Sequence, residues 1–273
     1  MADSIFERDG NDYVATALAR GPWDPKACHG GAPAALLAAA VDAAPSLVAM
    51  QGVRLTYDLL RPVPIGQPLA MDVTVAREGK RVQFVDATLT TIDRLELVRC
   101  RALRVRTTEL ALPEDRPGEQ APPHPGPDGL ERFAGLSTWE RDGFWRAVDV
   151  RFVEGMLGQA GRGIAWFRVV APLIDVTDGD HSDGDGPRLT SLARAAAAAD
   201  FGNGIGAPLP MGPYRYVNPD LTVELHRLPQ GEWVAMSSRS IPHANGIGLT
   251  TSTLFDREGQ IGGAFQSLFL DAG

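Results

Sequence analysis

The sequence is short of the features that mark several large classes of protein. Its two cysteines, Cys28 and Cys100, are too few for a disulfide framework or a four-thiolate metal site. Unpaired thiols are typical of a reducing compartment, so we expect a cytoplasmic protein. The longest apolar run, Ala32 to Val41, is well short of the roughly 20 residues of a membrane-spanning helix. The first residues, MADSIFERDG, lack a basic segment followed by an apolar one, so we expect neither a signal peptide nor membrane insertion.

Positive charge is also in short supply. The chain has 26 Lys and Arg against 34 Asp and Glu, a formal net charge of -8. A nucleic-acid surface needs clustered basic side chains, so we expect no nucleic-acid partner and assign the acidic excess to solubility. With 44% hydrophobic residues over 273 positions, the chain can bury one large core or two ordinary ones.

Familiar catalytic and cofactor motifs are missing. The sequence has no G-x-S-x-G, no phosphate-binding P-loop and no histidine spacing suited to a metal, and GNGIG at Gly202–Gly206 follows a helix instead of leading into one. The acidic stretch 175–187 resembles a calcium loop but has neither the glycine at its sixth position nor the glutamate at its twelfth. We therefore predict an exposed acidic loop, no metal and no cofactor.

What is present is an internal repeat. LTYDLLR at Leu55–Arg61 matches LTVELHR at Leu221–Arg227 at an offset of 166 residues, and Ala87–Leu103 matches Ser252–Leu268 at an offset of 165. At the second offset Gln266 falls on Arg101. Two matches at nearly one offset indicate two copies of one structural unit.

Each copy has the same order of elements: strand-like segments, a helix rich in small residues, then about four alternating strands joined by short turns. The helices are expected at 31–44 and 189–200. The later strands are expected at 51–61, 69–78, 81–92 and 95–107, and at 215–227, 232–242, 246–256 and 259–270. Strands joined by short turns pair antiparallel, and an Ala/Leu helix without a polar face must be covered. The fold class is therefore α+β, with a curved antiparallel sheet around a central helix, twice.

The stretch between the copies is poor in large apolar side chains. Six prolines fall between Pro113 and Pro127, which predicts an extended linker that lets the halves pack as a pseudo-dimer. We place the N-terminal unit at 1–110, the linker at 111–132 and the C-terminal unit at 133–273.

Three polar residues stand out in the second copy. Asp200 ends an alanine-rich helix, where the macrodipole disfavours an acid; it is either a solvated residue before a glycine stop or a functional carboxylate. Gln266 shares its strand face with Ala264, Leu268 and Leu270, which predicts a buried amide that needs partners. Asn218 precedes Pro219 at the start of a strand, a common position for a turn residue.

With these residues in view, the chain resembles the acyl-CoA thioesterase II type of double-hotdog protein, and most closely the thioesterase-like proteins of actinobacteria. GPWDPKACHGG, YVNPDLTVELHR, EWVAM and GIGLTTSTLFDREGQIGGAFQSLFL carry the resemblance, which extends from about Asp12 to Leu270. It implies a tandem hotdog fold with the two central helices side by side. It also implies hydrolysis of acyl-CoA to a free fatty acid and CoA by an activated water, without a covalent intermediate.

In that family an Asp at the end of the second helix, a Thr at the start of the next strand and a Gln in the last strand hold the water. Asp200 and Gln266 fall on the first and third positions, and Asn218 stands where the Thr is expected. The resemblance therefore implies Asp200 as general base, with Asn218 and Gln266 orienting the water. An amide differs from a hydroxyl in length and geometry, so this departure bears directly on activity.

The turn His29-Gly30-Gly31 resembles the HGG turn of single-domain thioesterases, where glycine permits close backbone approach to the thioester. We predict that these residues contact substrate, with a structural role for the His29 side chain as the other interpretation. Copy one offers no carboxylate on its helix before Asp42, and Cys28 has no identifiable base beside it, which argues against a cysteine nucleophile.

Three functions remain open. The first is an acyl-CoA thioesterase with an apolar acyl tunnel. The second is a double hotdog that binds acyl-CoA or another acyl ligand without hydrolysis, which Asn218 favours. The third is a hotdog hydratase or dehydratase, although the sequence has no clear D-x-x-x-x-H motif. We also expect a homo-oligomer to be possible, because hotdog sheets often associate at their edges.

Overall fold

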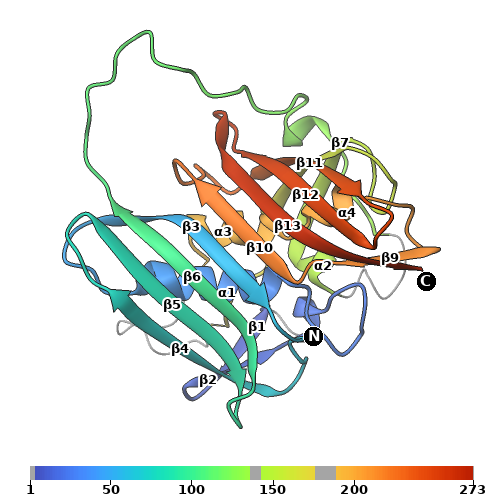
Figure 1. Cartoon of the computed structure of the whole chain (residues 1–273), viewed down its shortest axis with the longest axis horizontal. Helices are drawn as coiled ribbons and strands as arrows, with labels where there is room; N and C mark the ends of the chain where they lie inside the picture. Colours follow the sequence, from blue (N-terminus) through green and yellow to red (C-terminus); the bar gives the residue numbers. More distant parts are fainter. Residues whose placement is uncertain (1–3, 136–142, 176–188, 273) are drawn as a thin grey trace.

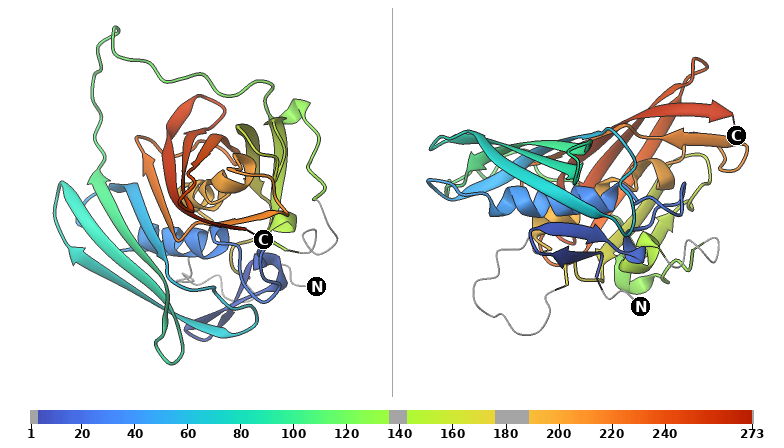
Figure 2. Two further views of the ribbon diagram at one scale, coloured as in Figure 1. Left: turned by 45° about the vertical axis from the view of Figure 1, so that its right-hand side comes forward. Right: turned by 90° about the horizontal axis from the view of Figure 1, so that it is seen from below.

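The computed structural model describes residues 4–135, 143–175 and 189–272. Within these residues, 13 strands form one strongly curved antiparallel sheet in the order β1-β2-β4-β5-β6-β3-β10-β13-β12-β11-β8-β7, with β9 paired to β13. The sheet curves around two central helices (Figure 1). Views from two further directions show both helices on its concave side (Figure 2).

The first copy contains one helix and six strands. Its elements are β1 Phe6–Asp9, β2 Asp12–Ala15, the short 3-10 helix Ala17–Ala19, α1 Gly31–Ala43, β3 Met50–Leu59, β4 Pro68–Arg77, β5 Val82–Thr91 and β6 Glu96–Arg106. The predicted helix and four later strands are confirmed to within two residues at each end.

The second copy repeats this order. Its elements are α2 Phe144–Ala147, β7 Val148–Glu154, β8 Gly163–Val169, α3 Ser191–Ala199, α4 Gly202–Ile205, β9 Tyr214–Val217, β10 Asp220–Leu225, β11 Val234–Pro242, β12 Ile247–Phe255 and β13 Gln260–Ala272. The predicted strand 215–227 is two strands, β9 and β10, because the chain breaks at Asn218-Pro219, where proline supplies no N–H to a ladder. The predicted acidic loop lies almost wholly outside the described residues.

The two copies are related by a pseudo-twofold axis. Along the sheet, the order on one side of the β3–β10 contact mirrors the order on the other. At that contact Thr56 pairs with Thr222, which are equivalent positions of the sequence repeat. The duplication read from the sequence therefore coincides with the symmetry of the strand pairing.

The pairing corrects one detail of the repeat. Tyr57 of β3 pairs with Cys100 of β6, whereas the counterpart of Tyr57, Val223 of β10, pairs with Ala264 of β13. The structural alignment of β6 with β13 is therefore shifted by one residue from the alignment of the two sequences. Gln266 therefore corresponds to the buried Ala102 and not to Arg101. The side chain of Arg101 points outward to Asp86.

The central helices α1 and α3 consist mainly of small residues, and most of their residues are buried. Alanine lets two backbones approach closely, and the start of α1 lies against the end of α3. A Cβ added at Gly31 would lie 2.7 Å from the carbonyl oxygen of Ala197. This close approach places the first turn of α1, from one copy, beside Asp200, from the other.

Residues 107–118 are exposed and have no helix or strand. Figure 1 shows this segment arching away from the sheet. It rejoins the second copy at Glu119 and Gln120, where Glu119 pairs with His226 and Arg227. Among the described helices, none is long and apolar enough to cross a bilayer.

Candidate active site

Asp200 is the C-terminal cap of α3, and its side chain is 5% exposed. The negative C-terminal end of the α3 dipole disfavours a carboxylate there. The positive N-terminal end of the α1 dipole lies beside Asp200 and offsets this effect. Gly30 caps the N-terminus of α1, and a Cβ added to it would lie 2.7 Å from Oδ2 of Asp200. The structure therefore contradicts the interpretation of Asp200 as a solvated residue before a glycine stop.

Both carboxylate oxygens of Asp200 have close polar neighbours. The Asn218 side-chain amide donates to Oδ1 at 2.9 Å, and Nδ1 of His29 lies 3.0 Å from Oδ2. Asn218 and Asp200 belong to the second copy, whereas His29 belongs to the first. The site is thus assembled at the junction of the two copies.

Asn218 is held on both sides of its amide group. Its Nδ2 also donates to the carbonyl oxygen of Asp220 at 3.2 Å, a local contact typical of a turn residue. Its Oδ1 accepts a hydrogen bond from Nδ2 of Asn203 at 3.2 Å. The Asn218 side chain therefore both stabilises the turn and contacts Asp200.

Gln266 is buried, as the alternation of its strand predicts. Its Oε1 accepts from the backbone N–H of Asn203 at 3.0 Å, and its Nε2 lies 3.4 Å from the carbonyl oxygen of Asp200. These bonds fix the turn between α3 and α4. Gln266 does not line the cavity described below.

The turn before α1 presents His29 and Gly30 to the same place. The imidazole of His29 is 8% exposed and lies against two aromatic rings, with centroids 5.0 Å from Phe144 and 4.4 Å from Phe201. Gly31 packs against α3 and does not line the cavity. The three residues predicted to contact substrate thus divide into two at the cavity and one in the helix interface.

A cavity of about 510 Å³ opens beside Asp200. Asp200, Asn218, His29 and Gly30 all line it, and Asn203 joins them. Its remaining walls are largely apolar and come from both copies, including Pro33, Val63, Val98, Trp145, Leu157, Phe201 and Met211. An apolar cavity with a few convergent polar groups is the usual form of a small-molecule site.

Cys28 also lines this cavity. Burial raises the pKa of its thiol well above the ordinary value, so the thiol is not ionised at neutral pH. No described side chain accepts a hydrogen bond from it. A cysteine nucleophile is therefore unsupported, in agreement with the sequence.

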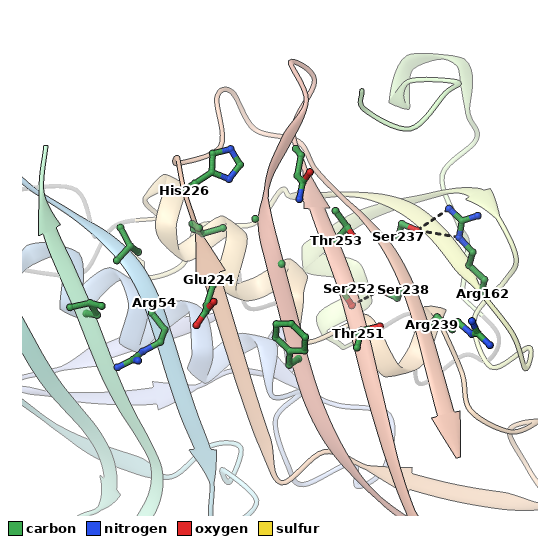
Figure 3. A pocket seen from close by; sticks show the side chains of 17 residues that line it. Arg54, Arg162, Glu224, His226, Ser237, Ser238, Arg239, Thr251, Ser252 and Thr253 are labelled. Carbon is green, nitrogen blue, oxygen red and sulfur yellow. Dashed lines mark hydrogen bonds between the residues drawn. The ribbon is translucent and has the colours of Figure 1, made fainter. Parts of the chain in front are cut away.

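A second hollow of about 950 Å³ lies elsewhere, across β3, β10, β13, β12 and β11. Figure 3 shows its labelled side chains, among them Arg54, Glu224 and Arg239, on the strands with the central helices behind. Its serines pair with one another or with arginine: Ser238 with Ser252, and Ser237 with Arg162. This hollow contains none of the predicted site residues, so we place the candidate site in the smaller cavity.

Sequence reasoning missed two features of the site. Asn203 was seen only as part of a glycine-rich segment, although it joins Asn218 to Gln266. The contact between His29 and Asp200 was also missed, because only the packing of α1 against α3 brings them together. Among the described residues, no three His, Cys, Asp or Glu side chains gather closely enough to hold a metal ion.

The fold and this cavity define a tandem hotdog protein. A family model for the acyl-CoA thioesterase N-terminal domain matches residues 19–105, and one for the acyl-CoA thioesterase C-terminal domain matches residues 118–270. The chain belongs to the acyl-CoA thioesterase family. A search of curated proteins finds no match.

Solved structures share the whole fold at low sequence identity. A hot dog fold protein of unknown function from Alicyclobacillus acidocaldarius superposes with a TM-score of 0.71 at 16% identity, covering 99% of this chain and 97% of that one. A protein assigned as a thioesterase from Novosphingobium aromaticivorans gives 0.70 at 22% identity, over 99% and 100%. Acyl-CoA thioesterase II TesB2 from Mycobacterium marinum gives 0.65 at 17% identity, over 98% and 96%. These likenesses confirm the predicted fold class.

Proposed function

We propose that this protein hydrolyses acyl-CoA to a free fatty acid and CoA, using a water molecule activated by Asp200. One observation carries the proposal: a buried carboxylate stands in the wall of a largely apolar cavity, hydrogen-bonded to Asn218 and facing the first turn of α1. The cavity would receive the acyl chain, and the polar group at its wall would meet the thioester.

The start of α1 offers hydrogen-bond donors for the carbonyl oxygen of the thioester. The first N–H groups of a helix have no partner within the helix, and they stabilise negative charge. In the described part of the chain, the Gly30 N–H donates to no other residue. We propose that it donates to the thioester oxygen as this oxygen becomes an oxyanion.

Gln266 has a less direct role in this proposal than the family resemblance implies. Its amide bonds Asn203 and the Asp200 backbone, so it would hold the turn that presents Asp200 instead of binding the water itself. Asn218 keeps the carboxylate of Asp200 in place through its hydrogen bond of 2.9 Å.

The test is release of free thiol from acyl-CoAs ranging from acetyl to palmitoyl, by the wild type and by Asp200→Asn. Loss of the carboxylate should lower kcat by about 10²–10⁴-fold, the usual contribution of a positioned acid or base. Asp24→Asn is the matched control, because Asp24 is another aspartate of the same cavity, and among the described residues its carboxylate accepts only the local Lys26 N–H. Equal turnover by wild type and Asp200→Asn would refute the role of Asp200.

A second candidate is a protein that binds an acyl ligand without hydrolysing it. The specific observation in its favour is Asn218, whose two N–H donors are already committed to Asp200 and to Asp220. Tight binding of acyl-CoA with no thiol release by the wild type would support this function. The Asn218→Thr variant, which restores the family's hydroxyl, should then gain turnover.

We also propose a cellular compartment and a mode of self-association for this protein. The free thiols Cys28 and Cys100 support a reducing compartment such as the cytoplasm. Exposed apolar side chains on β11, β12 and β13, namely Ile241, Ile247 and Phe269, would suit contact between copies in a homo-oligomer.

A further inference from the structure

Among the described residues that line the cavity, Arg61 is the only lysine or arginine. It follows the end of β3, and its side chain is exposed at the cavity rim. Its Nη1 donates to the carbonyl oxygen of Glu96 at 2.7 Å, a contact that orients the guanidinium without neutralising it. No carboxylate of the described residues forms an ion pair with Arg61, and the carboxylate of Glu96 pairs with Arg99 instead. The cavity rim therefore carries one unpaired positive charge.

The internal repeat shows the same arginine with a structural partner. Arg227 is the equivalent of Arg61 in the second copy, and its guanidinium makes two hydrogen bonds to the buried carboxylate of Asp256. In the first copy the position of Asp256 is taken by Thr91, since each of these two residues starts the turn between the last two strands and donates its backbone N–H across that turn. Thr91 has no carboxylate, and its hydroxyl binds Asp93. The first copy therefore has the arginine but lacks the carboxylate that binds it in the second copy.

The other charges of the lining leave this guanidinium available to a ligand. The carboxylate of Asp24 accepts the N–H of Lys26 within its own turn, and Asp200 lies deeper and is 5% exposed. Because the chain has a formal net charge of -8, its overall field repels anions, so an anionic ligand needs a specific cation where it binds. A guanidinium binds phosphate through paired N–H groups of fixed geometry.

The rest of the rim is apolar. Trp23, Leu60, Val217 and Phe269 line the cavity, and each of these side chains is between 43% and 62% exposed. The ring of Trp23 packs at a steep angle against the buried Tyr216, with the ring centroids 5.7 Å apart. The rim thus offers an apolar surface with one guanidinium in it. A ligand that fits this rim is a largely uncharged chain that ends in a phosphate.

We infer that Arg61 binds the phosphate of a phosphopantetheine arm, so that the rim of the cavity selects phosphopantetheine thioesters over simple thioesters. This inference rests on the proposed thioester hydrolysis. From sulfur to phosphate the arm is about as long as four extended residues, roughly 14 Å. It is long enough to extend from a thioester beside Asp200 to the rim of a cavity of about 510 Å³. CoA and acyl carrier proteins both present their acyl groups on this arm, so one phosphate site serves either source.

Two thioesters of the same acyl group test the phosphate contact: one on phosphopantetheine and one on pantetheine, which lacks the phosphate. For the wild type we expect a KM about tenfold lower for the phosphopantetheine thioester, because a hydrogen bond between charged groups has about this effect. Arg61→Gln should raise this KM about tenfold with little change in kcat, and should leave the KM of the pantetheine thioester unchanged. Arg61→Lys retains the charge without the paired N–H groups, so its KM should fall between the two.

Arg77→Gln is the matched control for this substitution. Arg77 is another exposed arginine of the first copy, but it lies on β4 and does not line the cavity. The control removes the same charge and should leave both KM values unchanged. Melting temperatures establish that the variants are folded. An equal rise in KM for both thioesters in Arg61→Gln, or no rise for either, would overturn the assignment.

Calorimetric titration with free phosphopantetheine and free pantetheine tests the same contact without turnover. The wild type should bind phosphopantetheine about tenfold more tightly, and Arg61→Gln should remove this preference. Absence of the preference in the wild type would overturn the inference. If the preference is present and depends on Arg61, but the wild type releases no thiol from any thioester, the proposed function fails and the phosphate site stands.

The same acyl group on CoA and on an acyl carrier protein identifies the source of the arm. Both substrates contain the phosphate, so Arg61→Gln should raise the KM of each, and the lower wild-type KM identifies the carrier that the protein uses. Unchanged KM values for both substrates in Arg61→Gln would contradict a phosphate site at the rim.

Discussion

Gly30 sets the space available to the Asp200 carboxylate. Its φ of -58° is open to any residue, so conformational freedom does not explain a glycine at this position. A Cβ would instead lie 2.7 Å from Oδ2 and 3.0 Å from Oδ1 of Asp200, well inside van der Waals contact. The glycine is needed because the start of α1 approaches the carboxylate so closely.

We therefore predict that Gly30→Ala displaces Asp200 and lowers kcat for thiol release by about 100-fold, the cost of a misplacement of about 1 Å. The melting temperature should change little, since the strain falls on one side chain at the edge of a cavity. Gly118→Ala is the control, because a Cβ there meets nothing within 4 Å. A Gly30→Ala enzyme with unchanged kcat would show that the carboxylate does not act from this position.

At this scale the sequence predicted individual residues better than their partners. Burial of Gln266 follows from strand alternation, and the unfavourable helix end singles out Asp200. Neither pattern reveals that Asp200 meets His29, since 170 residues separate them and only the packing of α1 on α3 joins them. Asn203 escaped notice because its backbone N–H and its side chain act in two different contacts.

Among the described carboxylates, the most enclosed lies in the turn between β12 and β13. Asp256 is fully buried, accepts a bidentate pair from Arg227, and accepts the backbone N–H groups of Glu258 and Gly259 in the turn and of Gln230 outside it. Burial alone would raise its pKa, but the Arg227 guanidinium and the N–H groups of Gln230 and Glu258 outweigh it and lower the pKa. A carboxylate whose pKa is lowered by folding stabilises the protein above its unfolded pKa, near 3.9, and this stability is lost as pH falls through the folded value.

We predict that Asp256→Asn lowers the free energy of unfolding by about 3 kcal/mol at pH 7, because it leaves the mostly buried Arg227 without its main partner. The deficit relative to wild type should shrink as the pH falls below about 4. Urea unfolding of both proteins at pH 7 and pH 3 measures it. Asp86→Asn, which breaks the exposed pair with Arg101, should cost under about 1 kcal/mol. A constant deficit at both pH values would contradict the assigned cause.

The order of elements was predictable because each element carries its own pattern: alternation in the strands and small residues in the helices. The break at Asn218-Pro219 was not seen, because the strand pattern continues across it. The one-residue shift that makes Ala102 the equivalent of Gln266 was also missed, because the alternating pattern of the last strands matches at either alignment. Strand pairing fixes register, and sequence similarity alone does not.

On the scale of the whole molecule, the halves are held together by more than the linker. They share the β3–β10 pairing and the contact between α1 and α3. The segment 107–118 lies exposed outside both. The covalent connection is therefore not what keeps the site assembled.

A protease site inserted beside Gly118 should allow the linker to be cut without separating the halves. The cut protein should elute as one particle of the original size and retain thiol release. Its melting temperature should become concentration dependent, since unfolding now releases two chains. Separation of the fragments under native conditions would show that the shared sheet is insufficient. Uncut protein with the same insertion is the control.

A pseudo-twofold molecule has two equivalent places for a ligand, but within the described residues only one of them holds the side chains of the proposed site. The counterpart of Gln266 is Ala102, and the start of α3 has Thr190 and Ser191 where α1 has Gly30 and Gly31. The Thr190 hydroxyl already accepts the N–H of Ala193, so that helix end satisfies itself. The stoichiometry of binding should consequently be one acyl ligand per chain, and calorimetric titration with a non-hydrolysable acyl-CoA analogue should saturate at one equivalent instead of two.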